Sequence, residues 1–244
     1  MNWLLINKIR RFLHIGWIKT LYFNFTKLPL EQAIKLPIIL TRNTYFYDLS
    51  GKIEIKGPVS SGMIRFGFFG EDTHVWNSVK TLLKIRGKII FEGSSHYGIG
   101  VIIRVEENAT LRIGNNVRIS NNAKIISYKE IEIGSNCRIA WETQIIDTTF
   151  HYMKDVITDE VNVRDGIIKI GKNNWIGNRT TISKGTVTPD YCIIASGSLC
   201  NKIYEIPNNS FIAGIPAKFV KTNIVRLLDA EESEYINKLK NKKE

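Results

Sequence analysis

The chain reads IGKNNWIGNRTTISKGTVTPDYCIIASGSLC from Ile170 to Cys200, and this stretch counts in sixes. An aliphatic or small residue stands at every sixth position: Ile170, Ile176, Ile182, Thr188, Ile194 and Cys200. A helical period of about 3.6 residues cannot produce this spacing. Three such hexads form one triangular turn of a parallel β-helix, and the aliphatic residue of each hexad points into the coil.

The same spacing recurs upstream, which extends the predicted coil towards the N-terminus. The sixfold positions there are Ile113, Ile119 and Ile125, followed by Ile133, Ile139 and Ile145. Small residues that can turn inward near a corner follow four positions later: Val117, Ala123, Cys137, Thr143, Thr149, Thr180, Thr186, Cys192 and Ser198. Lys129 and Asn174 are exceptions to this second register. The repeat predicts a mainly β protein, a parallel β-helix that is regular from residue 111 to about residue 206.

The repeat divides the chain into four regions. Residues 1–40 are expected to form a helical, amphipathic N-terminal segment that Pro29 and Pro37 interrupt. Residues 41–110 are expected to hold irregular early coils and loops, and residues 61–84 to loop out. A fainter sixfold count in this region runs through Ile85, Phe91, Tyr97 and Ile103. Residues 111–221 carry the regular coil, broken by a polar excursion at 151–168, and residues 222–244 are expected to form a C-terminal helix and a basic tail. Long loops of this kind are usually functional or disordered.

Composition limits the classes of protein that fit. The chain has 244 residues, 43% of them hydrophobic, and a formal net charge of +11 at pH 7. That length can bury a sizeable core, and a basic surface favours anionic partners, although spare lysine on an ordinary surface is the alternative. Nucleic acid is not an expected partner, because the sequence has no recognised motif or row of interleaved aromatic residues for it. Three cysteines in packing positions suit a reducing compartment and argue against a disulfide framework.

The N-terminal segment combines basic and apolar side chains. The first 30 residues hold five basic residues and no acidic one. Leu5, Ile9, Phe12 and Leu13 lie among these charges, a pattern that suits an amphipathic helix on an anionic membrane surface. The alternative is that the helix caps the open end of the coil. No apolar run here is long enough to span a bilayer, and no signal-peptide cleavage site follows. The expected location is the cytoplasm, either free or peripheral on the inner face of the membrane.

Histidine is the usual side chain for moving a proton near neutral pH. Of His14, His74, His96 and His151, the last lies in DTTFHY, where the coil gives way to the excursion. A residue at such a break can face a cleft, so His151 is the candidate catalytic residue, and a solvated histidine without function is the alternative. A metal-dependent hydratase would need three histidine ligands at one site, and the sequence has no close histidine pair. No metal is therefore expected.

Three segments resemble consecutive signatures of the hexapeptide-repeat acyltransferases, in particular the maltose, galactoside and capsular-polysaccharide O-acetyltransferases. They are IEIGSNCRIAWETQIIDTTFHYM, IKIGKNNWIGNRTTISKG and IIASGSLCNKIYEIPNNSFIAGIPAKFVK. The resemblance covers about residues 111–221. It implies a left-handed parallel β-helix, a homotrimer with active sites between neighbouring coils, and acetyl-CoA as the acetyl donor.

The resemblance also implies roles for individual residues. The family's catalytic histidine falls on His151, and the tryptophan beside its cleft falls on Trp175. The residues that fall along the CoA channel are Gly177, Asn178, Ala195, Ser196, Lys202 and Lys218, with Lys218 near the phosphates. Asp147, four positions before His151, is a candidate to orient the imidazole. Two departures leave the acceptor open: DTTFH stands where related surface-glycan enzymes often read DTDFH, and HY stands where sugar acetyltransferases often read HP.

The expected function is O-acetyl transfer from acetyl-CoA to a sugar hydroxyl in surface glycan biosynthesis, with His151 as the general base. An amino-sugar N-acetyltransferase is one alternative, since its donor site would be the same. A non-enzymatic β-helix that serves as a scaffold is the other, and it would explain the repeat without the excursion.

Overall fold

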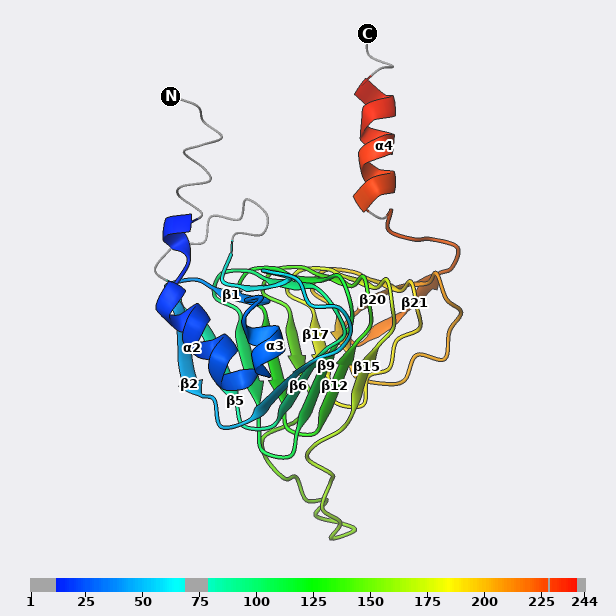
Figure 1. Ribbon diagram of the computed structural model, residues 1–244. Helices are drawn as coiled ribbons and strands as arrows, with labels where there is room; N and C mark the ends of the chain where they lie inside the picture. Colours follow the sequence, from blue (N-terminus) through cyan, green and yellow to red (C-terminus); the bar gives the residue numbers. More distant parts are fainter. Residues whose placement is uncertain (1–11, 69–78, 228, 241–244) are drawn as a thin grey trace.

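The computed structural model describes residues 12–68, 79–227 and 229–240, whose strands form three sheets around one core (Figure 1). The first sheet contains β1 (Ile38–Leu40), β4 (Ile64–Phe66), β7 (Ser95–Tyr97), β10 (Val117–Ile119), β13 (Arg138–Ile139), β16 (Trp175–Ile176), β18 (Ile193–Ile194), β20 (Phe211–Gly214) and β21 (Ala217–Lys221). The second contains β2 (Thr44–Asp48), β5 (Thr81–Ile85), β8 (Ile102–Val105), β11 (Lys124–Ser127), β14 (Gln144–Ile146), β17 (Thr181–Ser183) and β19 (Leu199–Cys200). The third contains β3 (Lys52–Ile55), β6 (Lys88–Phe91), β9 (Thr110–Ile113), β12 (Glu130–Ile133) and β15 (Ile168–Ile170).

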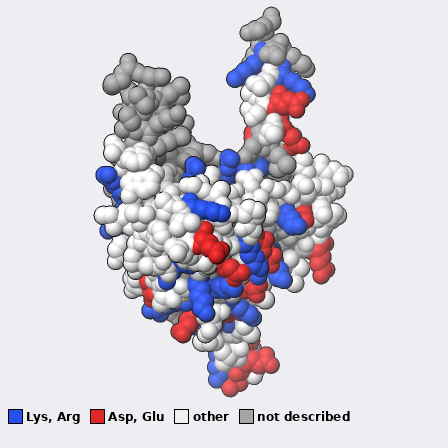
Figure 2. Space-filling view, in the orientation of Figure 1, with Lys and Arg blue, Asp and Glu red and all other residues white. Residues whose placement is uncertain are grey.

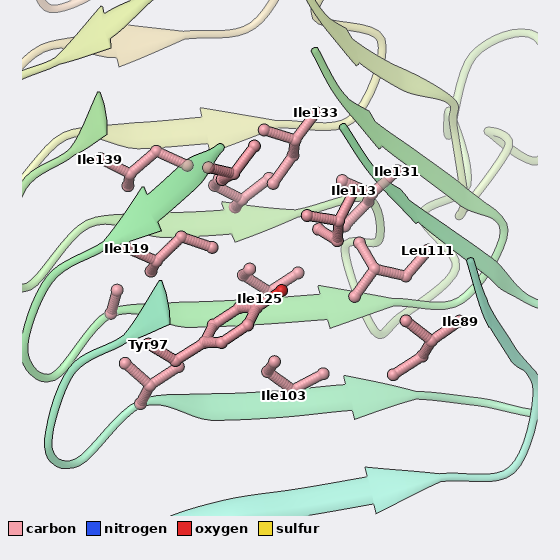
Figure 3. Close-up of a cluster of buried hydrophobic side chains, with 14 of the residues drawn as sticks. Ile89, Tyr97, Ile103, Leu111, Ile113, Ile119, Ile125, Ile131, Ile133 and Ile139 are labelled. Carbon is pink, nitrogen blue, oxygen red and sulfur yellow. The ribbon is translucent and has the colours of Figure 1, made fainter. Parts of the chain in front are cut away.

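The hexads map onto the three sheets in turn, as the sequence predicts. Ile170 lies in β15 of the third sheet, Ile176 in β16 of the first and Ile182 in β17 of the second, and all three are buried. Ile176 stands in register between Ile139 and Ile194 on the neighbouring strands. Isoleucines therefore stack in ladders along the coil, and Figure 3 shows this core from the inside. β-Branched side chains suit these positions because they pack well on a pleated, buried surface.

The small residues of the second register also face inward. Val117, Ala123, Thr143 and Thr180 are buried, and the three cysteines are buried free thiols. Burial raises the pKa of Cys137 and of Cys192 to about 12 and that of Cys200 to about 11, so these thiols stay protonated. The prediction that they are packing residues is confirmed.

The early part of the coil is more regular than the sequence predicts. The expectation that residues 61–84 loop out is wrong for β4 and for the start of β5, where Ile64, Phe66 and Leu83 are buried in the core. Ile85, Phe91, Tyr97 and Ile103 lie in β5, β6, β7 and β8, and the coil begins already at Ile38. The sixfold count is hard to read here because the connection between β4 and β5 is much longer than one corner, so the residues between two core positions no longer number six.

The N-terminal helices cover the first turn of the coil. α2 (Trp17–Lys27) and α3 (Leu30–Ala33) precede β1 (Figure 1). Asn24 donates to the carbonyl of Ile38 at 2.7 Å and accepts from its N–H at 3.2 Å, and Thr20 Oγ1 accepts from Leu40 N at 3.1 Å. These bonds satisfy an otherwise unpaired strand edge. α2 thus caps the coil, and Leu5 and Ile9 of the expected amphipathic helix lie outside the described residues.

The C-terminal end leaves the coil in two steps. β21 pairs antiparallel with β20 and closes the first sheet, with Ala217 buried. α4 (Asp229–Lys240) is the expected C-terminal helix and projects away from the coil (Figure 1). In the described part of the chain, no helix combines the length and apolar character needed to cross a membrane.

Candidate active site

His151 lies where the expected excursion begins. Residues 148–167 connect β14 of the second sheet to β15 of the third and extend away from the coil as a long loop (Figure 1). The base of the loop is pinned, because Thr148 Oγ1 donates to Asp165 at 2.5 Å and Thr149 N donates to the Arg164 carbonyl at 3.1 Å. His151 is exposed beside this base, and its carbonyl accepts from Thr149 Oγ1 at 3.1 Å. An imidazole on a fixed loop base and open to solvent can reach a bound hydroxyl group.

An aromatic and cationic cluster surrounds the loop base. The Tyr128 ring contacts Phe150 edge to face at a centroid distance of 5.7 Å. The Arg164 guanidinium lies between the rings of Tyr128 and Tyr152, at 5.3 and 5.1 Å from their centroids, and Arg104 donates to the Tyr128 hydroxyl. Such cation–π contacts rigidify the segment that carries His151. Sequence reasoning missed this cluster, because its members come from three different turns and no single motif holds them.

Asp147 is bound to the preceding turn of the coil, and its role in orienting His151 stays a prediction. Its carboxylate is buried and accepts from Ser127 Oγ at 2.9 Å, Tyr128 N at 2.6 Å and Lys129 N at 2.9 Å. Burial raises the pKa of Asp147, and these three bonds oppose that rise. The carboxylate therefore holds the corner of the preceding turn against the start of the excursion. The sequence could not show this, because a polar residue four positions before a histidine fits either role.

A long groove with a volume of about 2080 Å³ runs along the outer side of the first sheet and the corner that follows it. Trp175, Gly177, Asn178 and Ser196, all predicted for the donor site, line this groove. Ser196 Oγ and Asn178 Oδ1 are 2.6 Å apart, which joins two successive turns at the corner. A Cβ atom on Gly177 would lie 2.4 Å from Ser196 N, so a glycine is needed for the turns to stack this closely.

The remaining predicted donor residues lie at different places. Ala195 directly precedes Ser196, and its carbonyl accepts from Thr180 Oγ1 at 3.1 Å. Lys218 is exposed in β21, opposite Ala213 of β20, one strand beyond the groove's last turns. Lys202 follows β19, with its ammonium 5.6 Å from the centroid of the Tyr204 ring.

These positions belong to two corners of the triangular coil. Gly177 and Ser196 follow strands of the first sheet and lie at the corner between the first and second sheets. His151 and Lys202 follow strands of the second sheet and lie at the corner between the second and third. Within one chain, the structure therefore does not bring His151 to the groove.

The groove is strongly basic. The histidines, arginines and carboxylates among the described residues that line it are His14, Arg42, Arg65, His96, Arg118, Arg138, Arg226 and Glu232. Figure 2 shows basic side chains beside the foot of α4. Burial, followed by the charges of Arg65, Arg118 and Arg138, lowers the pKa of His96. A sequence signal existed, since a basic residue directly precedes the core residue of this sheet in RF, HY, RI and RI at residues 65, 96, 118 and 138.

No group of three or more histidine, cysteine or acidic side chains in the described ranges is arranged to hold a metal ion.

Known proteins share this repeat and this coil, although the chain matches no family model. It is 32% identical over 151 residues to an uncharacterised 24.8 kDa protein of the Klebsiella pneumoniae cps region. The aligned residues cover 62% of this chain and 66% of that protein. It is 24% identical over 143 residues to the putative lipopolysaccharide biosynthesis O-acetyltransferase WbbJ of Escherichia coli K12, covering 55% of this chain and 72% of that protein. With the galactoside O-acetyltransferase of the same organism it shares 28% identity over 113 residues, 46% of this chain and 54% of that enzyme.

One solved structure shows the fold. The polysialic-acid-specific acetyltransferase NeuO superposes with a TM-score of 0.60 at 18% identity, covering 83% of this chain and 87% of NeuO. This confirms the predicted left-handed parallel β-helix. With its sixfold repeat, the chain has the left-handed β-helix fold of this acetyltransferase and is similar in sequence to proteins named as acetyltransferases.

Proposed function

We propose that the protein is an O-acetyltransferase that moves an acetyl group from acetyl-CoA to a sugar hydroxyl of a surface glycan. The observation that carries the proposal is an exposed histidine at the pinned base of a long loop, on a coil where Gly177, Asn178 and Ser196 line a groove at another corner. The similarity to proteins named as O-acetyltransferases supports the class of reaction.

In this mechanism His151 is the general base. Its neutral imidazole removes the proton from the acceptor hydroxyl while the oxygen attacks the thioester carbonyl. The tetrahedral intermediate then collapses, the carbon–sulfur bond breaks, and the imidazolium returns the proton to the CoA sulfur. The products are an acetyl ester and a free thiol, so atoms and charges balance. Positioned proton transfer contributes a factor of about 10² to 10⁴, and alignment of the two bound substrates contributes much of the rest.

The donor is proposed to bind along the corner that Gly177, Asn178, Ala195 and Ser196 form. Small side chains there leave a smooth surface for the pantetheine arm, and Ser196 and Asn178 present polar atoms to its amides. Lys218 supplies a cation for the phosphate end.

The active site is proposed to form between subunits of a homotrimer. His151 and the donor corner lie on different edges of one coil, so the histidine of one subunit would meet the groove of its neighbour. Coexpression of His151→Ala with Ser196→Trp tests this arrangement. Each variant alone should be inactive, and mixed oligomers should regain up to about a quarter of the wild-type sites by random assembly. No recovery in mixed oligomers would contradict a shared site.

The function itself is tested by free-thiol release from acetyl-CoA in the presence of sugars and glycan fragments. His151→Ala should keep its fold and donor binding and lose about 10² to 10⁴ in turnover. Val156→Ala is the matched control, because Val156 lies on the same loop and is 92% exposed. If His151→Ala keeps more than about a tenth of the wild-type rate, His151 is not the base. An amino-sugar acceptor that outperforms every hydroxyl acceptor would favour N-acetylation instead.

Membrane contact through the N-terminal segment is also proposed. The face of α2 that points away from the coil exposes Ile18, Leu21, Tyr22 and Phe25, and such a surface suits the interface of an anionic bilayer. Ile18→Ser together with Phe25→Ser should weaken cosedimentation with vesicles that contain phosphatidylserine. These residues leave the cap intact, since its bonds come from Thr20 and Asn24. Equal sedimentation of variant and wild type would leave α2 with its capping role alone.

A further inference from the structure

Tyr152 directly follows His151 at the base of the excursion. Its side chain is 67% exposed. Consecutive Cα atoms are about 3.8 Å apart, so a molecule that lies against the Tyr152 ring is within reach of the neighbouring imidazole. Aromatic rings provide a large contact area at binding sites, whereas a single exposed ring is ordinary on a protein surface. The contacts that hold this ring therefore matter more than its exposure.

Arg164 covers one face of the Tyr152 ring. Its guanidinium carbon lies 5.1 Å from the ring centroid of Tyr152 and 5.3 Å from that of Tyr128. A guanidinium is planar and stacks on aromatic faces, so it lies between the two rings as a third flat group. Because one face of Tyr152 is covered in this way, the exposed area of the ring belongs to its other face and its edge.

Arg164 is itself fixed in orientation. Its Nε and Nη2 atoms donate to the two carboxylate oxygens of Asp165 at 2.9 and 2.8 Å, and Asp165 also accepts from Thr148 Oγ1 at 2.5 Å. A two-bonded pair of this kind sets the plane of the guanidinium as well as its position. Asp165 also neutralises the charge of Arg164, so the stack does not depend on an anionic ligand. A ring that is already held in place loses little conformational entropy when a ligand stacks on it.

The stack is also anchored to the coil through Tyr128. Arg104, which lies in β8, donates to the Tyr128 hydroxyl, and its guanidinium carbon is 5.1 Å from the Tyr128 ring centroid. Phe150 contacts the same ring edge to face. The support of Tyr152 therefore reaches a strand of the second sheet instead of ending in the loop. Binding groups that rest on rigid elements are positioned more accurately than groups on loops alone.

Two exposed tyrosines of β2 differ from Tyr152 in their surroundings. The ammonium of Lys80 lies 5.4 Å from the Tyr45 ring centroid, and that of Lys84 lies 5.6 Å from the Tyr47 ring centroid. A lysine is a point charge on a flexible stem and cannot form a flat stack with the ring. β2 is four strands from β14 in the second sheet, about 19 Å, so these rings are remote from His151. They are matched controls for Tyr152.

We propose that Tyr152 is a specificity-determining residue whose ring stacks on the acceptor sugar, and that Arg164 is the positioning residue that holds this ring. The inference rests on the proposed function and states how that site recognises its acceptor. A pyranose whose hydroxyl groups are equatorial has flat faces of C–H groups, and such a face packs on an aromatic ring. An axial hydroxyl pressed against the ring would lose its water without gaining a hydrogen bond. The acceptor therefore presents a flat C–H face to Tyr152 and a hydroxyl at its edge to His151.

The first test measures binding separately from catalysis. The probes are methyl β-D-glucopyranoside, whose ring substituents are all equatorial, and methyl α-D-altropyranoside, which has axial oxygens on both faces. Saturation-transfer NMR with the full chain measures their affinity and shows which sugar protons lie against the protein. The glucoside should bind more tightly, with the strongest signals from the C–H groups of one ring face. Tyr152→Ala should weaken it about two- to tenfold, whereas Tyr152→Phe, which keeps the ring, and Tyr45→Ala should bind like the wild type.

The second test uses steady-state thiol release. Tyr152→Ala should raise the KM for the sugar about two- to tenfold and leave kcat and the KM for acetyl-CoA within about twofold, because a stacking contact is made equally in the ground state and the transition state. Arg164→Lys keeps the charge and loses the planar group. It should therefore raise the same KM in the same direction, while Tyr152→Phe restores the wild-type value.

Each other outcome overturns the inference. Equal losses in Tyr152→Ala and Tyr152→Phe would assign the contact to the hydroxyl instead of the ring, and a fall in kcat at constant KM would mean that Tyr152 acts only through His151. Equal binding of the two pyranosides, or binding of neither, would remove the flat C–H face as the selected feature. Thiol release keeps the two proposals apart. Release with an unchanged acceptor KM in Tyr152→Ala removes the stacking site alone, and ring-dependent binding without any release removes the acetyltransferase function.

Discussion

Replacing Asp147 by asparagine separates a structural role for this carboxylate from a catalytic one. Tyr128 N donates to one carboxylate oxygen, and Ser127 Oγ and Lys129 N donate to the other. An amide has one acceptor oxygen, so in either orientation one of the two backbone N–H groups must face the amide nitrogen. The perturbation therefore removes at least one buried hydrogen bond and sets two donors against each other.

The expected loss of stability follows from these contacts. A buried donor left without its acceptor costs about 1–3 kcal/mol, and the bonds that remain lose their charge assistance. Burial disfavours the charged carboxylate and raises the pKa of Asp147. A neutral asparagine avoids this cost of burying a charge, which offsets part of the loss. The free energy of unfolding should fall by about 2–3 kcal/mol, which lowers Tm by about 4–12 °C for a chain of this size.

Urea and thermal unfolding measure this loss against a matched control. Asp190 accepts a single bond on Oδ1, from Lys172 N at 2.7 Å, and an amide oxygen can replace it. Asp190→Asn should therefore stay within about 0.5 kcal/mol of the wild type. Equal losses in the free energy of unfolding for Asp147→Asn and Asp190→Asn would refute the argument that the number of hydrogen bonds lost sets the cost. A stable Asp147→Asn protein whose thiol-release rate has a shifted pH profile would instead restore Asp147 as the partner of the catalytic imidazole.

Three further predictions test the donor site, the core and the groove. Lys218→Glu should raise the KM for acetyl-CoA in steady-state assays and Lys221→Glu, on the same strand, should not; an unchanged KM would direct attention to the other candidate lysine. Ile125→Ala should lower the free energy of unfolding by about 2–5 kcal/mol, and Ile126→Ala, which points outward from the same strand, by less than about 1 kcal/mol; similar losses in denaturant titrations would contradict the inward and outward alternation. Because burial and neighbouring arginines lower the pKa of His96 from its ordinary value of 6.5, the unfolded chain takes up that proton first as pH falls. Stability should therefore drop below about pH 6.5, and Tm measured from about pH 8 to pH 5 should fall less in His96→Gln; identical pH dependence would remove His96 as a contributor.

The core was readable from the sequence because one rule, an aliphatic residue every six positions, fixes both the sheet and the inward direction of each side chain. Ile170, Ile176 and Ile182 fall on three different sheets as that rule requires. The rule fails where a corner is lengthened, and for that reason β4 and β5 were expected to be loop. The spacing of hydrophobic residues predicts the fold, but it does not predict the lengths of the connections between strands.

The candidate site was only partly readable. The resemblance of short sequence motifs to those of known acyltransferases identifies His151, Trp175 and Gly177 as candidates. The structure places Trp175 and Gly177 in one groove, and the roles of all three stay predictions. The contacts of Asp147 could not be read from the sequence, because its three donors come from a turn about 20 residues earlier in the chain. The basic residues of the groove were overlooked for the same reason, since Arg65, His96 and Arg118 become neighbours through strand pairing and not through sequence adjacency.

The excursion has a consequence for how this coil can vary. β12 and β15 pair without a slip, Ile131 with Ile168 and Ile133 with Ile170, although residues 148–167 lie between the turns they belong to. The turn from Ile176 to Ile194 advances by 18 residues, that from Ile119 to Ile139 by 20 and that from Tyr97 to Ile119 by 22, and all three keep the same ladder. Corners are therefore sites that tolerate insertions: a segment of another length can be placed there while the strands of the turns on either side keep their register. Transplanting residues 148–167 between proteins of this coil should exchange acceptor preference without rebuilding the scaffold.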